Sequence, residues 1–193
     1  MPTLMVIIGS TRPGRAGLPI AEWFAERAKQ HGHFDLRIAD LAAIGLPLLA
    51  DPHHPRLRQY VHQHTWDWSA QVEEADAFVV VTPEYNYGYP AAVKNAIDHL
   101  SQEWAYAPVG FVSYGGVAAG TRAVQQLKQV VTTLRMVPVF ESVNIPFHAQ
   151  LIHDGVLAAT PVMADAATAM LDELARVEEG MRPLRSAAVR QPR

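Results

Sequence analysis

The chain has 193 residues, of which 49% are hydrophobic and 18% charged, so it can bury one core of ordinary size and is not an intrinsically disordered chain. Its net charge of -3 argues against a non-specific nucleic-acid binder, which needs a strongly basic surface. It contains no cysteine, which excludes disulfides, thiolate nucleophiles and thiolate metal sites.

The first apolar run, residues 4–8, is too short to span a membrane or to form the core of a signal peptide. It ends in Gly9 and Ser10, without the small-residue pattern of a cleavage site. We therefore expect a soluble, cytoplasmic protein that does not insert into membranes.

Short apolar runs rich in β-branched residues alternate with helical patterns along the chain. The first, third and fourth runs are apolar without alternation, as in strands covered on both faces, whereas the second alternates like an edge strand. The pattern predicts an α/β fold with an open, doubly wound parallel sheet, in which ligands bind at the carboxyl ends of the strands. The five runs are residues 4–8, 34–38, 77–82, 109–113 and 137–140.

The last predicted helix begins at Thr160, a good N-cap residue, with Pro161 in its first turn, and it ends before Gly180. Beyond it the chain has arginines and no acidic residue, and Pro183 and Pro192 interrupt any helix. We therefore divide the chain into a single domain over residues 1–180 and a basic tail over residues 181–193, to which we assign no function.

Residues 43–58 show neither the helical nor the strand periodicity of apolar residues, and they are interpreted as a long loop that leads into a helix. Trp66 and Trp68 lie two positions apart on that helix, so we expect one to be buried and the other partly exposed. His62 and His64 have the same spacing and should point to different faces, so we expect no metal site there.

The loop after the first strand carries hydroxyls and arginines at the start of a helix, which is a good arrangement for binding an anion. Glycines allow close backbone approach, the helix N-terminus presents free N–H groups, and arginine binds phosphate oxygens in pairs. The loop is not a P-loop, because no lysine follows Gly14, and it is not a dinucleotide-binding loop, because four residues separate Gly9 from Gly14. The alternative is that the arginines pair with surface acids. The candidate ligands of a phosphate are Ser10, Thr11, Arg12 and Arg15.

Two further loops follow the third and fourth strands and suit a flat ring. Tyrosines offer planar surfaces, an asparagine can bind a polar ring edge, and adjacent glycines expose backbone amides. Taken singly, the first of these loops could instead be a turn that covers the core edge, and the second a tight connection. The candidate residues are Pro83, Glu84, Tyr85, Asn86 and Tyr87 in the first loop, and Ser113, Tyr114, Gly115 and Gly116 in the second.

One phosphate loop and two ring loops on the same edge of a sheet predict a site for flavin mononucleotide, FMN. With these motifs the sequence resembles the NADPH-dependent FMN reductase family, which has a flavodoxin-like fold. The resemblance covers residues 4–177, and its most specific part is the middle motif with the helix that follows. The matching motifs are Gly9-Ser10-Thr11-Arg12, Pro83-Glu84-Tyr85-Asn86, Lys94-Asn95-Ala96-Ile97-Asp98, and Ser113-Tyr114-Gly115-Gly116.

The resemblance implies a flavodoxin-like three-layer sandwich with a five-stranded parallel sheet of order 2-1-3-4-5. It places the FMN phosphate on the first loop and the isoalloxazine between the other two, with Tyr87 shielding a ring face. The family's commonest first loop has a second serine where Ala16 and Gly17 stand here. We expect Arg15 to supply that contact with the phosphate.

The implied activity is that of an NAD(P)H-dependent FMN oxidoreductase, which moves a hydride from NADPH or NADH to FMN and then reduces a small acceptor. Quinones, azo dyes, nitro compounds, metal oxyanions and free flavin are all candidate acceptors, and residues 43–58 are expected to influence the choice. We expect no essential acid–base side chain, and we expect Glu84 to act through its backbone, because a charge beside reduced flavin is unfavourable.

The competing function is a flavodoxin-like FMN-binding electron carrier without a nicotinamide site. The modest acidity of the chain and its arginine-bearing loop argue against a carrier. A third possibility is a family member that keeps the fold only as an interaction module. The resemblance, together with Trp104 and Tyr106 after the third helix, also predicts a homodimer or homotetramer.

Overall fold

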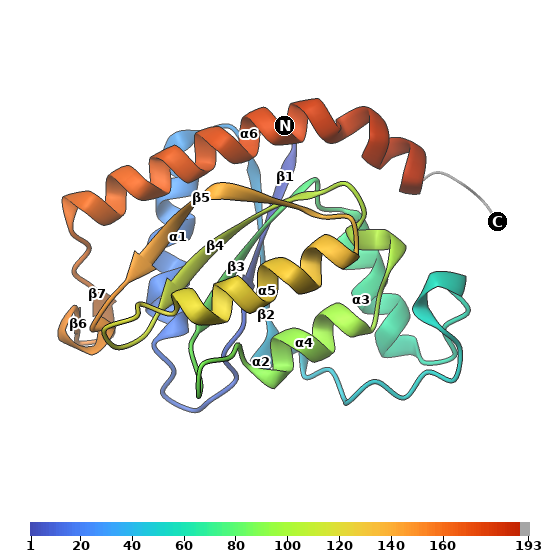
Figure 1. Ribbon diagram of the computed structural model, residues 1–193, viewed down its shortest axis with the longest axis horizontal. Coiled ribbons are helices and arrows are strands. Elements are labelled where there is room, and N and C mark those ends of the chain that lie inside the picture. Colours follow the sequence, from blue (N-terminus) through green and yellow to red (C-terminus); the bar gives the residue numbers. More distant parts are fainter. Residues whose placement is uncertain (190–193) are drawn as a thin grey trace.

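The computed structural model describes residues 1–189 as a five-stranded parallel sheet between two layers of helices (Figure 1). The strand order is β2-β1-β3-β4-β5, and every neighbouring pair is parallel. All five predicted strands are confirmed, and so is the flavodoxin-like order. The strands are β1 (Thr3–Ile8), β2 (Asp35–Asp40), β3 (Ala77–Pro83), β4 (Pro108–Tyr114) and β5 (Val137–Ile145).

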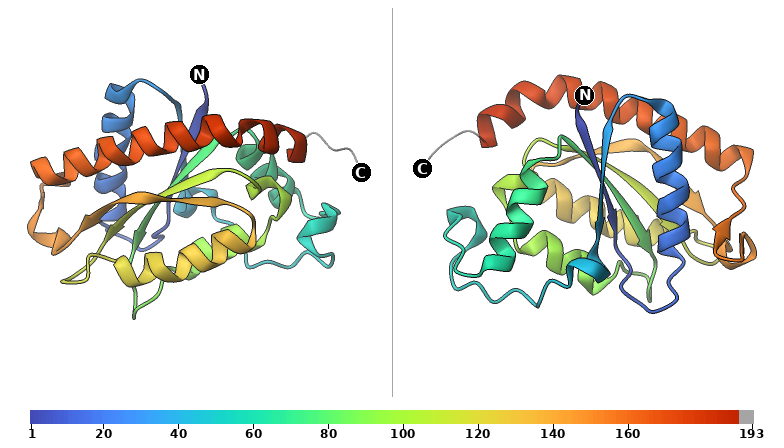
Figure 2. Two further views of the ribbon diagram at one scale, coloured as in Figure 1. Left: turned by 45° about the horizontal axis from the view of Figure 1, so that its top comes forward. Right: turned by 180° about the vertical axis from the view of Figure 1, so that it is seen from behind.

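Helices α1 (Gly17–His31) and α6 (Pro161–Val189) cover one face of the sheet, and the other helices cover the opposite face (Figure 2). The second layer contains α2 (Leu41–Ile44), α3 (Gln63–Glu73), α4 (Ala91–Asp98) and α5 (Thr121–Thr133). Short 3-10 helices η1 (Pro55–Leu57), η2 (Gln102–Trp104) and η3 (His148–Gln150) lie in the connections, and β6 (Ile152–His153) pairs with β7 (Val156–Leu157) in a small hairpin.

The core consists of one apolar cluster on each face of the sheet. Every residue of β3 and β4 is buried, as expected for strands without alternation. Trp68 is fully buried while Trp66 is 42% exposed, which confirms the prediction for this pair. Trp104 is also buried, in edge contact with Trp68 and Phe78. It therefore gives no support to a subunit interface.

The histidine pair differs from the prediction. The rings of His62 and His64 stack, with centroids 5.1 Å apart. The expectation that they diverge assumed that both lie within a helix. His62 instead precedes α3 as its N-cap residue and has an extended backbone, so the helical spacing rule does not apply to the pair.

Helix α6 begins as predicted but ends later. The hydroxyl of Thr160 accepts a hydrogen bond from the backbone N–H of Met163 at 3.3 Å. The helix then runs on through Gly180 and Pro183 to Val189, so the predicted end before Gly180 is wrong. Of the predicted tail, residues 190–193 lie outside the described part of the chain, and with them Arg190, Pro192 and Arg193.

A buried arginine explains why the helix continues. Arg185 is 6% exposed and donates five hydrogen bonds, at 2.6–3.4 Å, to backbone carbonyls. These carbonyls lie at the end of α3 and around η2, and they belong to Val72, Ala75, Glu103 and Ala105. The last turns of α6 are thus attached to the amino end of β3, and this attachment compensates for the N–H that Pro183 lacks.

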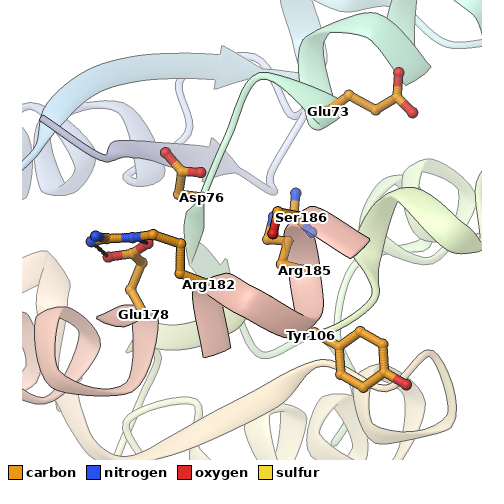
Figure 3. A pocket seen from close by; sticks show the side chains of 7 residues that line it. All are labelled: Glu73, Asp76, Tyr106, Glu178, Arg182, Arg185 and Ser186. Carbon is orange, nitrogen blue, oxygen red and sulfur yellow. Dashed lines mark hydrogen bonds and ion pairs between the residues drawn. The ribbon is translucent and has the colours of Figure 1, made fainter. Parts of the chain in front are cut away.

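Figure 3 shows the cavity of about 180 Å³ beside this attachment. Acidic side chains surround it, and Glu178 forms an ion pair with Arg182 at 2.7 Å. Burial lowers the pKa of Arg185, while the nearby carboxylates of Asp76 and Glu73 oppose that effect. The acids therefore help to keep a cation buried at this end of the sheet.

Within residues 1–189, no helix combines the length and the apolar composition needed to cross a lipid bilayer.

Candidate functional site

A cleft of about 340 Å³ opens at the carboxyl edge of the sheet. The loops after β1, β3 and β4 line it, as the position of the motifs predicted, and the connection after β5 adds one histidine. The lining residues are Arg12, Pro13, Gly14, Arg15 and Ala16 from the first loop, Pro83, Glu84 and Tyr85 from the second, Tyr114, Gly115 and Gly116 from the third, and His148.

The first loop leaves β1 through a tightly packed glycine. A Cβ at Gly9 would lie 2.5 Å from a methyl carbon of Val93 in α4, so the loop and α4 can approach closely only with glycine there. Ser10 is fully buried, and its hydroxyl lies 2.7 Å from the Tyr85 hydroxyl. Thr11 lines a separate small hollow beside α2. Neither hydroxyl lines the cleft directly.

The two arginines of this loop behave differently. Arg15 forms an ion pair with Asp40, the last residue of β2, which also caps α2 by accepting the N–H of Ala42 at 3.0 Å. Arg12 forms no ion pair within the described residues and lies 5.6 Å from the Tyr85 ring centre. Pairing with a surface acid therefore applies to Arg15, whereas Arg12 offers a free guanidinium to an anion in the cleft.

The second loop is a tight turn. Tyr85 and Gly88 exchange two backbone hydrogen bonds, at 2.8 and 2.9 Å, and the residues between them have positive φ, 50° at Asn86 and 71° at Tyr87. This is the geometry of a type I′ hairpin turn. The turn places Asn86 and Tyr87 at its tip, outside the cleft lining, and Tyr87 is 63% exposed.

Glu84 is held by an arginine from α5. Its carboxylate accepts a hydrogen bond from Nε of Arg122 at 2.6 Å, and the Arg122 guanidinium lies 3.7 Å from the Tyr87 ring centre. The Glu84 backbone N–H binds the carbonyl of Tyr114 at 3.2 Å. The Glu84 carboxylate is thus paired with a cation, which weakens the electrostatic objection to a carboxylate beside reduced flavin. Its expected backbone role toward the cofactor stays a prediction.

The third loop is shaped by Ser113. Its buried hydroxyl lies 2.8 Å from the carbonyl oxygen of Ala119 and 3.0 Å from the side-chain oxygen of Asn144, so it organises the loop and does not line the cleft. Gly120 has a φ of 81°, and a Cβ there would lie 2.9 Å from the backbone of Tyr114. Only glycine fits at this position.

His148 lines the cleft but was not predicted from the sequence as a site residue. Its Nδ1 lies 3.0 Å from the carbonyl oxygen of Gly115, and its ring lies 5.0 Å from that of Tyr114 in an edge-on contact. Because a carbonyl oxygen can only accept, Nδ1 carries the proton in this contact. The predicted fifth strand ended at Phe140, whereas β5 continues to Ile145. The loop that carries His148 was therefore not recognised as part of the edge.

The residues present fit FMN. At one end of the cleft are the N-terminus of α1, the free Arg12, and the Tyr114 hydroxyl, which is buried without a hydrogen-bond partner in the described part of the chain. These groups suit a phosphate. The other end of the cleft offers surfaces for a planar ring, which come from Pro83, Tyr85 and the backbone of Gly115 and Gly116.

Comparisons with known proteins identify the family to which the chain is similar. The family model described as NADPH-dependent FMN reductase matches residues 2–150. The chain is 40% identical over 149 residues to NAD(P)H-dependent FMN reductase of Schizosaccharomyces pombe, covering 75% of this chain and 74% of that protein. It is 45% identical over 69 residues to Quinone reductase of Escherichia coli, covering 33% of this chain and 37% of that protein.

Among solved structures, the flavoenzyme NAD(P)H:(acceptor) oxidoreductase FerB of Paracoccus denitrificans superposes with a TM-score of 0.74 at 24% identity. The alignment covers 94% of this chain and 99% of that one, which supports the fold. The family match covers more than half of the sequence and includes all the loops that line the cleft. The chain therefore belongs to the NADPH-dependent FMN reductase family and is an oxidoreductase with FMN as cofactor and NADPH or NADH as co-substrate.

Proposed function

We propose that this protein transfers a hydride from NADPH or NADH to FMN and then passes the electrons to a small acceptor such as a quinone, an azo dye, a nitro compound, a metal oxyanion or free flavin. The observation that carries the proposal is the cleft at the carboxyl edge of the sheet, in which Arg12, Tyr85 and Gly115 line one space. The named relatives, an FMN reductase and a quinone reductase, support a small redox acceptor.

When bound, FMN would accept the hydride from the nicotinamide and pass on the electrons, and the protein would bind and orient the reactants. Arg12 and the N-terminus of α1 would hold the phosphate. The loops that contain Tyr85 and Gly115 would hold the ring, and the ion pair between Glu84 and Arg122 fixes the first of them to α5. We assign no side chain a role in proton transfer, because hydride transfer between stacked rings needs none.

The test is the purified protein with and without the substitution Arg12→Leu. The wild-type protein should bind FMN with a flavin visible spectrum and oxidise NADPH in the presence of a quinone, with saturation in both substrates. Loss of a charge-assisted contact of about 2 kcal/mol should weaken FMN binding about 30-fold in Arg12→Leu. A wild-type protein that binds no FMN and oxidises no NADPH would refute the proposal. Bound FMN with slow, unsaturable reduction would indicate an electron carrier instead.

We also propose that the protein assembles as a homodimer or homotetramer. Trp104 is buried and Tyr106 lies under Arg135, so these two residues no longer support the idea. The proposal therefore rests on the family resemblance, and the exposed Phe140 on the edge strand β5, 85% accessible, is a candidate contact between subunits. Light scattering at working concentration should give at least twice the mass of one chain, and a monomeric mass would contradict the assembly.

A further inference from the structure

The Tyr114 side chain has a feature that the core packing does not explain. Tyr114 ends β4 and is only 3% exposed. Its hydroxyl is buried and makes no hydrogen bond to any residue in the part of the chain that the structure describes. Burying a hydroxyl without a hydrogen-bond partner costs about 1–3 kcal/mol. A ligand oxygen that accepts a hydrogen bond from this hydroxyl would remove that cost, which favours binding at this position.

The hydroxyl points to the phosphate end of the cleft. A Cβ built on Gly17, the first residue of α1, would lie 2.7 Å from the Tyr114 oxygen. Burial and the neighbouring Tyr85 raise the pKa of Tyr114, and they outweigh the nearby Ser10 hydroxyl, Arg15 and Arg12, which favour the ionised phenol. The phenol therefore stays protonated and can donate a hydrogen bond beside the helix N-terminus.

Two polar side chains of the first loop are already engaged. Ser10 and Tyr85 share a hydrogen bond, and Arg15 is paired with Asp40. The positions that precede and begin α1, Ala16 and Gly17, carry no side-chain hydroxyl. Besides the backbone N–H groups of the helix, the Tyr114 hydroxyl across the cleft is a neutral donor without a partner among the described residues, and it can meet an anion at this helix N-terminus.

We propose that Tyr114 is a phosphate-binding residue whose hydroxyl donates to the FMN phosphate, and that glycine at position 17 makes the room that this hydroxyl needs. The inference rests on the proposed FMN function. It moves Tyr114 from the isoalloxazine, where the family resemblance placed it, to the opposite end of the cofactor. The family's second serine is absent here, and its contact with the phosphate was expected from Arg15. The inference assigns that contact to Tyr114 instead.

The test compares FMN with riboflavin, which has the same ring and no phosphate. In Tyr114→Phe, the dissociation constant for FMN, measured by quenching of flavin fluorescence, should rise about 10-fold, as expected for the loss of one hydrogen bond to a charged group. The dissociation constant for riboflavin should not change. A second variant, Gly17→Ser with Tyr114→Phe, restores a hydroxyl at the same place and should recover part of the FMN affinity.

Thermal unfolding separates this role from a structural one. Because the hydroxyl has no partner among residues 1–189, Tyr114→Phe should leave the melting temperature of the flavin-free protein unchanged or slightly higher, and should reduce only the increase that FMN produces. Equal losses of FMN and riboflavin affinity, or a less stable flavin-free protein, would overturn the inference while leaving the proposed function intact. A wild-type protein that binds neither flavin would overturn both.

Discussion

Replacing Arg185 with methionine is expected to lower the free energy of unfolding by about 3 kcal/mol or more. The substitution keeps the apolar bulk of the side chain but removes the donors of all five hydrogen bonds to backbone carbonyls. Buried carbonyl oxygens that lose their donor account for most of the loss. Urea unfolding followed by circular dichroism measures the effect.

Arg176→Met is the matched control, because it removes an arginine from the same helix. The Arg176 side chain is 77% exposed, and the loss of its ion pair with Glu173 should change the free energy of unfolding little. A chain shortened to residues 1–180 should be destabilised at least as much as Arg185→Met. If the shortened chain unfolds at the same urea concentration as the full one, the last turns of α6 do not stabilise the domain.

Replacing Gly120 with alanine should destabilise the protein by about 3 kcal/mol, and it should also weaken FMN binding. The φ of 81° is in the left-handed region, which costs a side-chain-bearing residue about 1–2 kcal/mol. The new methyl would also lie 2.9 Å from both the backbone N and O of Tyr114, and relief of that contact must move the strand end that forms one wall of the cleft.

Gly155→Ala separates these two effects. Gly155, in the turn between β6 and β7, has a φ of 77°, but a Cβ there would meet nothing within 4 Å. The free energy of unfolding of Gly155→Ala should fall only by the cost of the left-handed backbone, about 1–2 kcal/mol. Its FMN affinity should not change. Equal losses of stability in Gly120→Ala and Gly155→Ala would show that the crowding around Tyr114 has no energetic effect.

The sheet and the position of the site were predictable because both depend on local patterns. Fully apolar runs identified β1, β3 and β4 as central strands, and helical repeats separated them. Parallel strands place their carboxyl ends at one edge, so motifs directly after strands had to meet there. This is why Arg12, Tyr85 and Gly115 could be assigned to one cleft from the sequence, although Asn86, assigned to the same site, lies outside its lining.

The partners of individual side chains were not predictable, because they come from distant parts of the chain. Nothing in the sequence near Arg15 indicates that Asp40 will pair with it, and nothing near Arg185 indicates carbonyls 80 or more positions away. A proline and a run of basic residues suggested a loose tail, whereas long-range hydrogen bonds determined the actual helix. The role of each cleft residue in binding FMN remains a prediction that the experiments above can decide.

The attachment of Arg185 and the proposed FMN cleft lie at opposite ends of β3. Ala75, which accepts two of the arginine's hydrogen bonds, precedes the strand, and Glu84 follows it. A strand of this length separates them by about 20 Å, a distance at which mutational effects on stability are usually additive. Substitutions that strengthen the attachment of α6 could therefore offset the stability lost through substitutions in the cleft. The substrate range could then be altered at the cleft while the domain stays folded.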